Sequence, residues 1–375
     1  MDSSKLDYTK SVAKKAQKPK VSNTQRLIRE SRRKVWAEIE NQKRILLNIK
    51  NINDDSDEDD DFDPCTRNSE NPVIFFKLER NESTVDLSNR IVGPVQITEI
   101  SDRYFPSMKV TRLLLRNCWL GNEGVRAVAR GLVNNLTVTE LDLSANKLDV
   151  NSVISIGEML RDNENLEKLS LASNSLTDAD VEPLMLVLQG KCKLKELCLS
   201  NNILGDDFAK AIGSVLAVNS NLVTLDLASN QLASQGIAAM ETELRRAKFL
   251  KFLDISWNYL YDEGAKVIAE VLKGNKSLEE LRICGNFIRV EGASYIGNAM
   301  RKNCNLRTLR LGHNLLKNEG ANVLIRELLQ SAETLLEILN LNGTVVDERL
   351  ASICRRELKE KFPQLKVIHL SESHS

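Results

Sequence analysis

A unit of 28 residues recurs along most of this 375-residue chain, and it constrains the fold more than any other feature. The stretch VTELDLSANKL at 138–148 returns as LEKLSLASNSL at 166–176. Similar stretches begin at residues 110, 194, 222, 250, 278 and 306. Because the period is fixed, we predict an array of stacked supersecondary units, each of which contacts only its neighbours.

One polar position of the unit is also periodic. It is held by Cys118, Asn146, Asn174, Asn202, Asn230, Asn258, Asn286 and Asn314. We expect these side chains to form a ladder that bonds buried backbone groups of the turn leaving each strand. Asn342 stands 28 residues after Asn314. A two-residue insertion shifts the aligned stretch to 336–346, however, so Thr344 takes the ladder position there.

The second half of each unit predicts a helix. Its apolar residues recur at spacings of three and four, as in Ala265, Ile268 and Leu272. Four residues past the ladder position stand side chains that favour helix N-caps. These candidate caps are Asn122, Asp178, Asp206, Ser234, Asp262 and Asn318.

The strand half carries the pattern L-x-x-L-x-L-x-x-N/C-x-L, so the chain resembles the leucine-rich repeat family over roughly residues 83–375. The full helix in each unit makes it similar to the ribonuclease-inhibitor type. This group includes repeat domains of Nod-like receptors, Ran GTPase-activating proteins, tropomodulins, and ciliary or testis leucine-rich repeat proteins. The resemblance implies an α/β fold: a right-handed horseshoe with one strand and one helix per 28-residue repeat, and a parallel sheet on the concave face.

Charge divides the N-terminal region. Residues 1–50 hold fourteen Lys/Arg and five Asp/Glu, whereas residues 51–70 hold nine acids and one Arg. We therefore expect a disordered or helical N-terminal arm before the repeats. The predicted segments are a disordered basic tail at 1–22, a basic amphipathic helix at 23–50, an acidic linker at 51–70, an N-terminal cap and first degenerate repeat at 71–109, leucine-rich repeats at 110–346, and a C-terminal cap repeat and tail at 347–375.

Three interpretations of the helix at 23–50 stay open. It caps the first repeat, it binds an acidic protein, or it pairs with the acidic run at 54–63. We favour a segment that binds a partner or masks the chain's own binding face. Ser56 precedes three acidic residues, a setting that acidophilic kinases favour, and is a candidate phosphorylation site.

Composition narrows the function classes. The formal net charge is +0, which argues against general nucleic-acid binding, and no run of about eighteen apolar residues predicts a membrane span. The seven scattered Cys and three His predict a reducing, cytoplasmic compartment and no metal site. No phosphate-binding loop, G-x-S-x-G elbow or H-E-x-x-H motif occurs, so we predict no catalytic residues, no cofactor and no enzyme. We expect a monomer.

Strand residues between the core leucines should face the concave surface. Along one such row the middle is acidic, with Asp226 and Asp254, and the C-terminal end is basic, with Arg282 and Arg310. Phe252 occupies an outward position, and Trp257 stands just before a ladder Asn. Because aromatic residues beside an acid fit an interface hot spot, we predict that these six residues bind a partner. The alternative is local packing at the rim.

The predicted function is a non-enzymatic scaffold that binds a protein partner on the concave face. The resemblance to ciliary members suggests a cytoskeletal or ciliary assembly. The alternative function is that of a GTPase-activating regulator of a Ran-like small GTPase, as in Ran GTPase-activating proteins. Single-turnover GTP hydrolysis by Ran-like GTPases distinguishes the two.

Overall fold

The computed structural model describes residues 83–190, 192–332 and 334–368. These residues belong to one compact unit, Cys65–Ser375, which is separate from Met1–Pro64. The segments expected at 1–22, 23–50 and 51–70, with Ser56, lie outside the described residues.

The described residues contain eleven strands in a single parallel sheet whose strand order follows the chain. The strands are β1 (Thr84–Asp86), β2 (Arg112–Leu114), β3 (Glu140–Asp142), β4 (Lys168–Ser170), β5 (Glu196–Cys198), β6 (Thr224–Asp226), β7 (Phe252–Asp254), β8 (Glu280–Arg282), β9 (Thr308–Arg310), β10 (Ile338–Asn340) and β11 (Lys366–Ile368). Between β9 and β10, Thr308 pairs with Ile338, two residues beyond the regular spacing of 28. The two-residue insertion seen in the sequence therefore lies between these strands.

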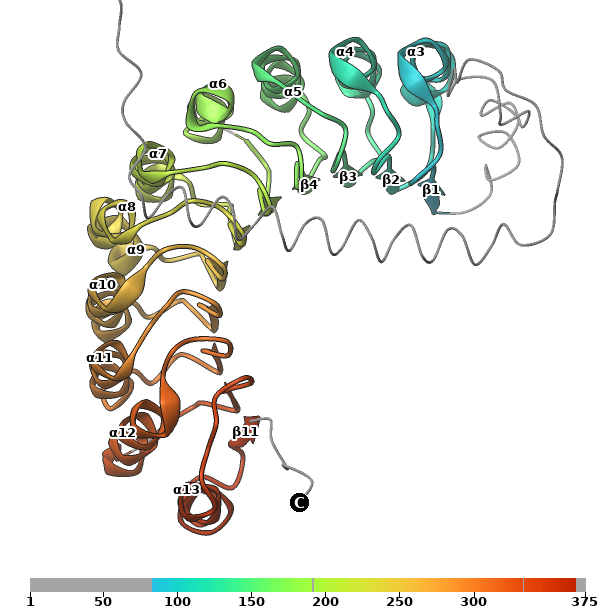
Figure 1. The fold of residues 1–375 in the computed structure, drawn as a ribbon. Helices are drawn as coiled ribbons and strands as arrows, with labels where there is room; N and C mark the ends of the chain where they lie inside the picture. Colours follow the sequence, from blue (N-terminus) through green and yellow to red (C-terminus); the bar gives the residue numbers. More distant parts are fainter. Residues whose placement is uncertain (1–82, 191, 333, 369–375) are drawn as a thin grey trace, which may run out of the picture. The chain divides into compact units, whose positions relative to one another are not determined.

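Helices alternate with the strands and lie on the outer side of the array, while the strands line its inner side (Figure 1). The α-helices are α3 (Gly93–Tyr104), α4 (Gly121–Leu132), α5 (Val150–Asp162), α6 (Asp178–Leu188), α7 (Asp206–Val218), α8 (Ser234–Ala239), α9 (Glu241–Arg246), α10 (Tyr261–Gly274), α11 (Val290–Met300), α12 (Lys317–Gln330), α13 (Glu348–Ile353) and α14 (Lys359–Lys361). A 3₁₀ turn, η1 (Phe105–Ser107), follows α3, and a π-helical turn, η2 (Cys354–Leu358), joins α13 to α14. The predicted fold class, an α/β repeat horseshoe, is confirmed.

One apolar core runs between the sheet and the helices. In one repeat, Leu169 and Leu171 of the strand segment and Val181 and Leu184 of α6 are all buried. Each fully buried side chain of this kind stabilises the fold by about 1.5–3 kcal/mol. The core is continuous because every repeat contributes the same positions, so no single repeat has a closed core of its own.

The turns leaving the strands are tied together by the asparagine ladder. The Asn146 Nδ2 group donates to the carbonyl oxygens of Leu115 at 2.8 Å and Leu143 at 3.1 Å. Its Oδ1 atom accepts from the amide of Cys118 at 3.0 Å. At the end of the ladder the Cys118 thiol donates to the carbonyl oxygen of Leu87 at 2.9 Å. The thiol thus supplies the donor that Asn supplies elsewhere.

A second ladder, which the sequence analysis did not single out, ties the turns between helix and strand. The Asn163 Nδ2 group donates to the carbonyl oxygen of Leu132 at 2.6 Å, and its Oδ1 atom accepts from the amide of Leu166 at 2.8 Å. The same side-chain bonds are made by Asn135, Asn219, Asn275 and Asn303. Both edges of the array are therefore held by buried amide side chains.

The predicted helix N-caps are wrong. The helices begin before or at these residues, and several of the side chains reach into the next repeat instead. The Asp262 Oδ1 atom accepts from the amides of Arg289 at 2.8 Å and Gly292 at 2.9 Å. The Asp206 Oδ1 atom likewise accepts from Ala233 at 2.8 Å. These carboxylates therefore join successive repeats rather than cap their own helices.

Candidate functional site

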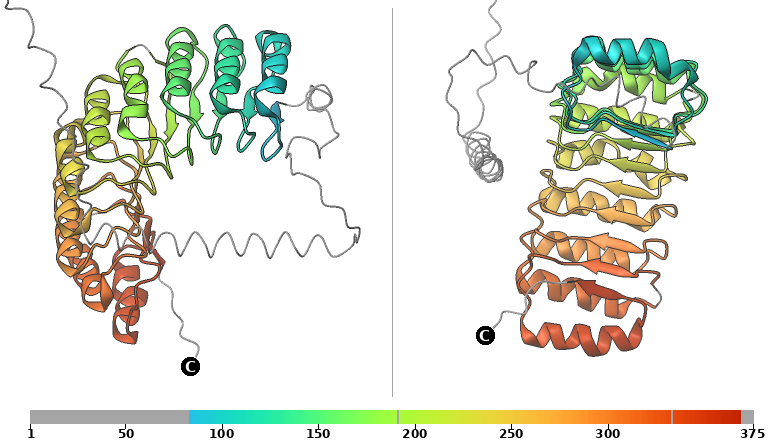
Figure 2. Two further views of the ribbon diagram at one scale, coloured as in Figure 1. Left: turned by 45° about the horizontal axis from the view of Figure 1, so that its top comes forward. Right: turned by 90° about the vertical axis from the view of Figure 1, so that its right-hand side faces the viewer.

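The strands line the concave side of the array (Figure 2). Their outward residues build the concave face. In its N-terminal half, acids and bases of neighbouring strands pair across the sheet. The Arg112 guanidinium lies 3.0 Å from the Glu140 carboxylate, and the Lys168 ammonium lies 2.8 Å from the Glu196 carboxylate. Because solvent reaches these groups and screens their charges, each pair contributes little to stability.

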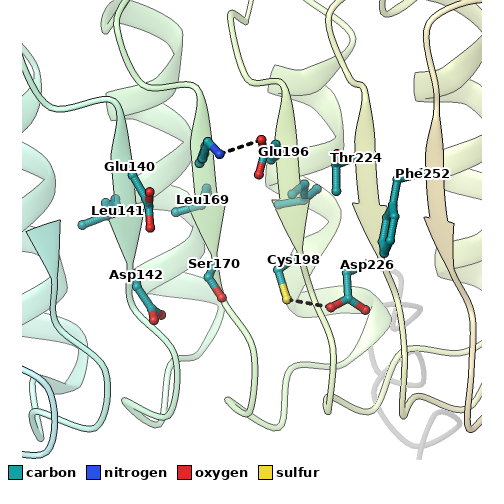
Figure 3. Close-up of a pocket in the computed structure, with 12 residues that line it drawn as sticks. Glu140, Leu141, Asp142, Leu169, Ser170, Glu196, Cys198, Thr224, Asp226 and Phe252 are labelled. Carbon is teal, nitrogen blue, oxygen red and sulfur yellow. Dashed lines mark hydrogen bonds and ion pairs between the residues drawn. The ribbon is translucent and has the colours of Figure 1, made fainter. Parts of the chain in front are cut away.

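A hollow of about 350 Å³ opens on the concave face over β3 to β7 (Figure 3). It is lined by Glu140, Leu141, Asp142, Lys168, Leu169, Ser170, Glu196, Leu197, Cys198, Thr224, Asp226 and Phe252. Asp142 and Asp226 accept hydrogen bonds from backbone amides two residues on, at 2.8 Å and 3.0 Å. Asp226 also accepts from the Cys198 thiol at 3.3 Å. The hollow therefore presents two carboxylates that accept hydrogen bonds from uncharged groups.

A cluster of charged residues borders the hollow at its C-terminal side. The Arg282 guanidinium lies 4.7 Å from the centre of the Phe252 ring, 2.6 Å from the Glu280 carboxylate and 3.7 Å from the Asp254 carboxylate. The Arg310 guanidinium lies 3.2 Å from the same Glu280 carboxylate. Glu280 thus joins both arginines. The sequence analysis missed it, although it stands two residues before Arg282 on the same strand face.

Asp254 is the most enclosed charge of this cluster, with 8% of its surface exposed. Burial raises the pKa of the Asp254 carboxyl, and Asp226 raises this pKa further, whereas hydrogen bonds from Ser256 and the charge of Arg282 oppose the shift. Its carboxylate is held by the Ser256 amide at 2.9 Å. Among the described residues, Arg282 supplies the one cation within ion-pair distance of this carboxylate.

Trp257 lies apart from the other predicted binding residues. It follows β7 in a turn with a φ of +59°, and its ring lies against Gly285, 5.6 Å from the His313 ring centre. Phe252, Asp254, Asp226, Arg282 and Arg310 all lie on strands β6 to β9 instead. The structure therefore brings five of the six predicted residues together on the sheet and places the sixth at its edge.

Other aromatic residues gather in the same turns as Trp257. The Phe287 ring stacks on the rings of Tyr259 and Tyr261, with centres 6.0 Å and 5.4 Å apart. Such stacking is a form of local packing at the rim, the alternative to partner binding that the sequence left open.

Within residues 83–190, 192–332 and 334–368, no group of three or more His, Cys, Asp or Glu side chains is arranged to hold a metal ion. Burial raises the pKa of the Cys198 thiol, and raises that of Cys118 to about 12, so both thiols stay protonated at neutral pH. In the described part of the chain, every helix is too short or too polar to cross a membrane.

The match to a family model agrees with this architecture. A family model described as Leucine Rich repeat matches residues 107–129, 162–185, 218–240, 247–269 and 302–324. The chain is similar to a solved structure titled Leiomodin-1 Actin-Binding Site 2, with 19% identity over 34% of this chain and 70% of that chain, at a TM-score of 0.29. It is also similar to a tropomodulin C-terminal domain from Caenorhabditis elegans, with 19% identity over 40% of this chain and 91% of that chain, at a TM-score of 0.35. A search of curated proteins gave no match.

Proposed function

The chain is a leucine-rich repeat protein, and we propose that it is a non-enzymatic scaffold that binds a protein partner on the concave face of its repeats. The observation that carries the proposal is the contact between Phe252 and Arg282 beside the hollow. Aromatic and arginine side chains are enriched among the residues that dominate binding energy at interfaces.

The cluster is held in place before any partner binds. Glu280 and Asp254 fix the Arg282 guanidinium, and the Phe252 ring lies beside it. Since ordering a flexible arginine on binding costs about 0.5–1.5 kcal/mol, a guanidinium that is already fixed favours a tight complex. The Phe252 side chain is half-buried, so a partner that covers it gains further apolar burial.

The carboxylates that line the hollow favour a positively charged group of the partner. Asp142 and Asp226 place carboxylates in its lining, and the Phe252 ring forms one wall (Figure 3). We propose that a lysine or arginine side chain of the partner enters here, where carboxylates attract it and an aromatic face stabilises it.

We propose a cytoskeletal or ciliary assembly as the setting. Filamentous actin and microtubules are defined probes for this part of the proposal. Cosedimentation of the purified full chain with each filament tests it directly. Absence of the chain from both pellets at physiological salt would count against a direct filament contact and leave other partners of the assembly.

The binding face itself is tested with Phe252→Ala. The partner is identified by affinity purification with mass spectrometry on the wild-type chain, and its affinity for each variant is then measured with purified proteins. We expect Phe252→Ala to weaken binding by about 30-fold, which corresponds to about 2 kcal/mol. Leu186→Ala, which removes an exposed leucine from the outer helix α6, is the matched control and should bind normally. Equal affinity of both variants would refute the concave site.

A further inference from the structure

The edge of the array beyond β7, β8 and β9 exposes large apolar side chains. The exposed fractions are 50% for Trp257, 37% for Tyr261, 39% for Phe287 and 47% for Leu315. With Tyr259 and His313 these residues form what we call the aromatic rim. Their rings form two groups that each span different repeats, Trp257 with His313 and Phe287 with Tyr259 and Tyr261. Exposed apolar side chains gathered in this way mark interaction surfaces.

The turns of the preceding repeats differ from Trp257 at one position and vary at the other. The Trp257 position is held by small or polar residues there: Asn117, Ala145, Ser173, Asn201 and Ser229. The Phe287 position is held by Trp119, Lys147, Ser175, Ile203, Gln231 and Tyr259. The repeat itself therefore does not require aromatic residues here.

The backbone also disfavours them. Trp257, Tyr261 and Phe287 have φ angles of 59°, 55° and 61°, in the left-handed region where bulky residues are rare. A non-glycine residue in this region carries a conformational cost that glycine avoids. Gly121 fills the position of Tyr261 in an earlier repeat, with a φ of +57°. Bulky side chains at costly backbone positions that leave 37% to 50% of their surface exposed are better explained by a covering partner than by packing within the chain.

Positive charge flanks the aromatic rim. Arg289 and Lys317 are exposed beside Phe287 and Leu315, and among the described residues neither has a carboxylate within ion-pair distance. Two acids of the same turns are already engaged: Asp262 accepts from backbone amides, and Glu291 accepts from the Tyr295 hydroxyl at 2.7 Å. The rim consequently offers unpaired cations next to apolar rings.

We propose that the aromatic rim is a second docking surface, separate from the concave face, for an extended peptide segment of a partner that carries carboxylates beside apolar side chains. Adjacent strands lie about 4.8 Å apart, so three consecutive turns span about 10 Å. Three or four residues of an extended peptide cover this length. Apolar side chains of the segment rest on the Trp257 and Phe287 rings, and its carboxylates reach Arg289 and Lys317.

The test uses a phage library of random twelve-residue peptides, selected on the full-length chain. The comparison chain carries Trp257→Ser and Phe287→Gln, which install the residues of the repeat at 229 and 231. Ser229 has a φ of +58°, close to the +59° of Trp257, and circular dichroism checks that both substitutions keep the fold. We expect enriched peptides with Asp or Glu next to Trp, Phe or Leu.

The most enriched peptide is then measured by fluorescence anisotropy. We expect its affinity to fall at least tenfold on the Trp257→Ser/Phe287→Gln chain, to fall about threefold to tenfold on an Arg289→Gln/Lys317→Gln chain, and to weaken as salt is raised. Phe252→Ala should leave it unchanged.

Several results would overturn the inference. The inference fails if no peptide is enriched, if the enriched peptides are basic, or if the peptide binds the Trp257→Ser/Phe287→Gln chain as tightly as the wild type. It also fails if light scattering shows dimers of the chain that this variant abolishes, because the surface would then bind a second copy. Loss of binding with Phe252→Ala but not with the rim variant would move the peptide to the concave face. That result refutes the rim and leaves the proposed function standing.

Discussion

Replacing Asn146 with alanine tests the physical basis of the ladder. Asn146 is 1% exposed, and its side chain bonds several backbone groups of two successive repeats. Not all of these groups lose their partner in Asn146→Ala. The Leu143 carbonyl keeps a bond from Asn174 at 3.2 Å, and the Ser144 carbonyl keeps the amide of Asn117 at 2.9 Å.

Three buried groups remain without the bond that Asn146 supplied. They are the Leu115 carbonyl and the amides of Cys118 and Leu120. A buried polar group left without a partner costs about 1–3 kcal/mol. Because water entering at the turn satisfies part of this need, we expect Asn146→Ala to lower the free energy of unfolding by about 4 kcal/mol.

Urea unfolding followed by far-ultraviolet circular dichroism at 25 °C measures the effect. The control is Asn151→Ala, since Asn151 is exposed on α5 and should change stability by less than about 0.5 kcal/mol. Asn146→Cys should lose less than Asn146→Ala, because a thiol replaces one donor, as Cys118 does toward Leu87. A loss below about 1 kcal/mol for Asn146→Ala would refute the argument from unsatisfied groups.

Three further predictions concern the turns and the concave face. Gly285→Ala places a methyl group against the Trp257 ring at a φ of +62°, so it should lower stability by about 2 kcal/mol and shift tryptophan emission. Burial raises the pKa of the Asp254 carboxyl, so the folded chain binds this proton more tightly than the unfolded chain does. The stability that results is fully present below the ordinary aspartate pKa of about 3.9. It is lost as the pH rises from there through the raised pKa of the folded state. Asp254→Asn should therefore be more stable than the wild type at pH 7, with the difference shrinking toward pH 4 in urea unfolding. Thr344→Val should leave stability unchanged or raise it, since the buried Thr344 hydroxyl has no hydrogen-bond partner among the described residues.

The repeat made the fold predictable because each position of the unit has one environment. A leucine such as Leu169 recurs 28 residues on at Leu197, and these two residues pair across neighbouring strands. The spacing alone therefore predicts the strand register, the layer of helices and the two-residue insertion before Ile338. It also predicts which residues share a row on the concave sheet.

Conformation within the unit was less predictable. The sequence places Trp257 five residues after Phe252, but it does not show that the chain leaves the sheet between them with a positive φ. The same limitation produced the wrong N-caps, because Asp262 has the right side chain for a cap and its partners lie 27 and 30 residues on. The residue type determines which hydrogen bonds a side chain is able to make. Which of these bonds forms depends on how the repeats stack.

The arrangement separates stability from binding along each repeat. Asn146 and Asn163, which bond to the neighbouring repeat, are buried. The Asn146 position is nearly invariant from unit to unit, and the Asn163 position is Asn again at 135, 219, 275 and 303. Positions that face outward differ in charge and size between repeats, as from Asp226 to Arg282. Since the buried ladders hold the register whatever the outward residues are, the concave face and the aromatic rim can carry different chemistry on one rigid frame. Two weak contacts made by the same partner on these surfaces would then reinforce each other, because the frame fixes the distance between them.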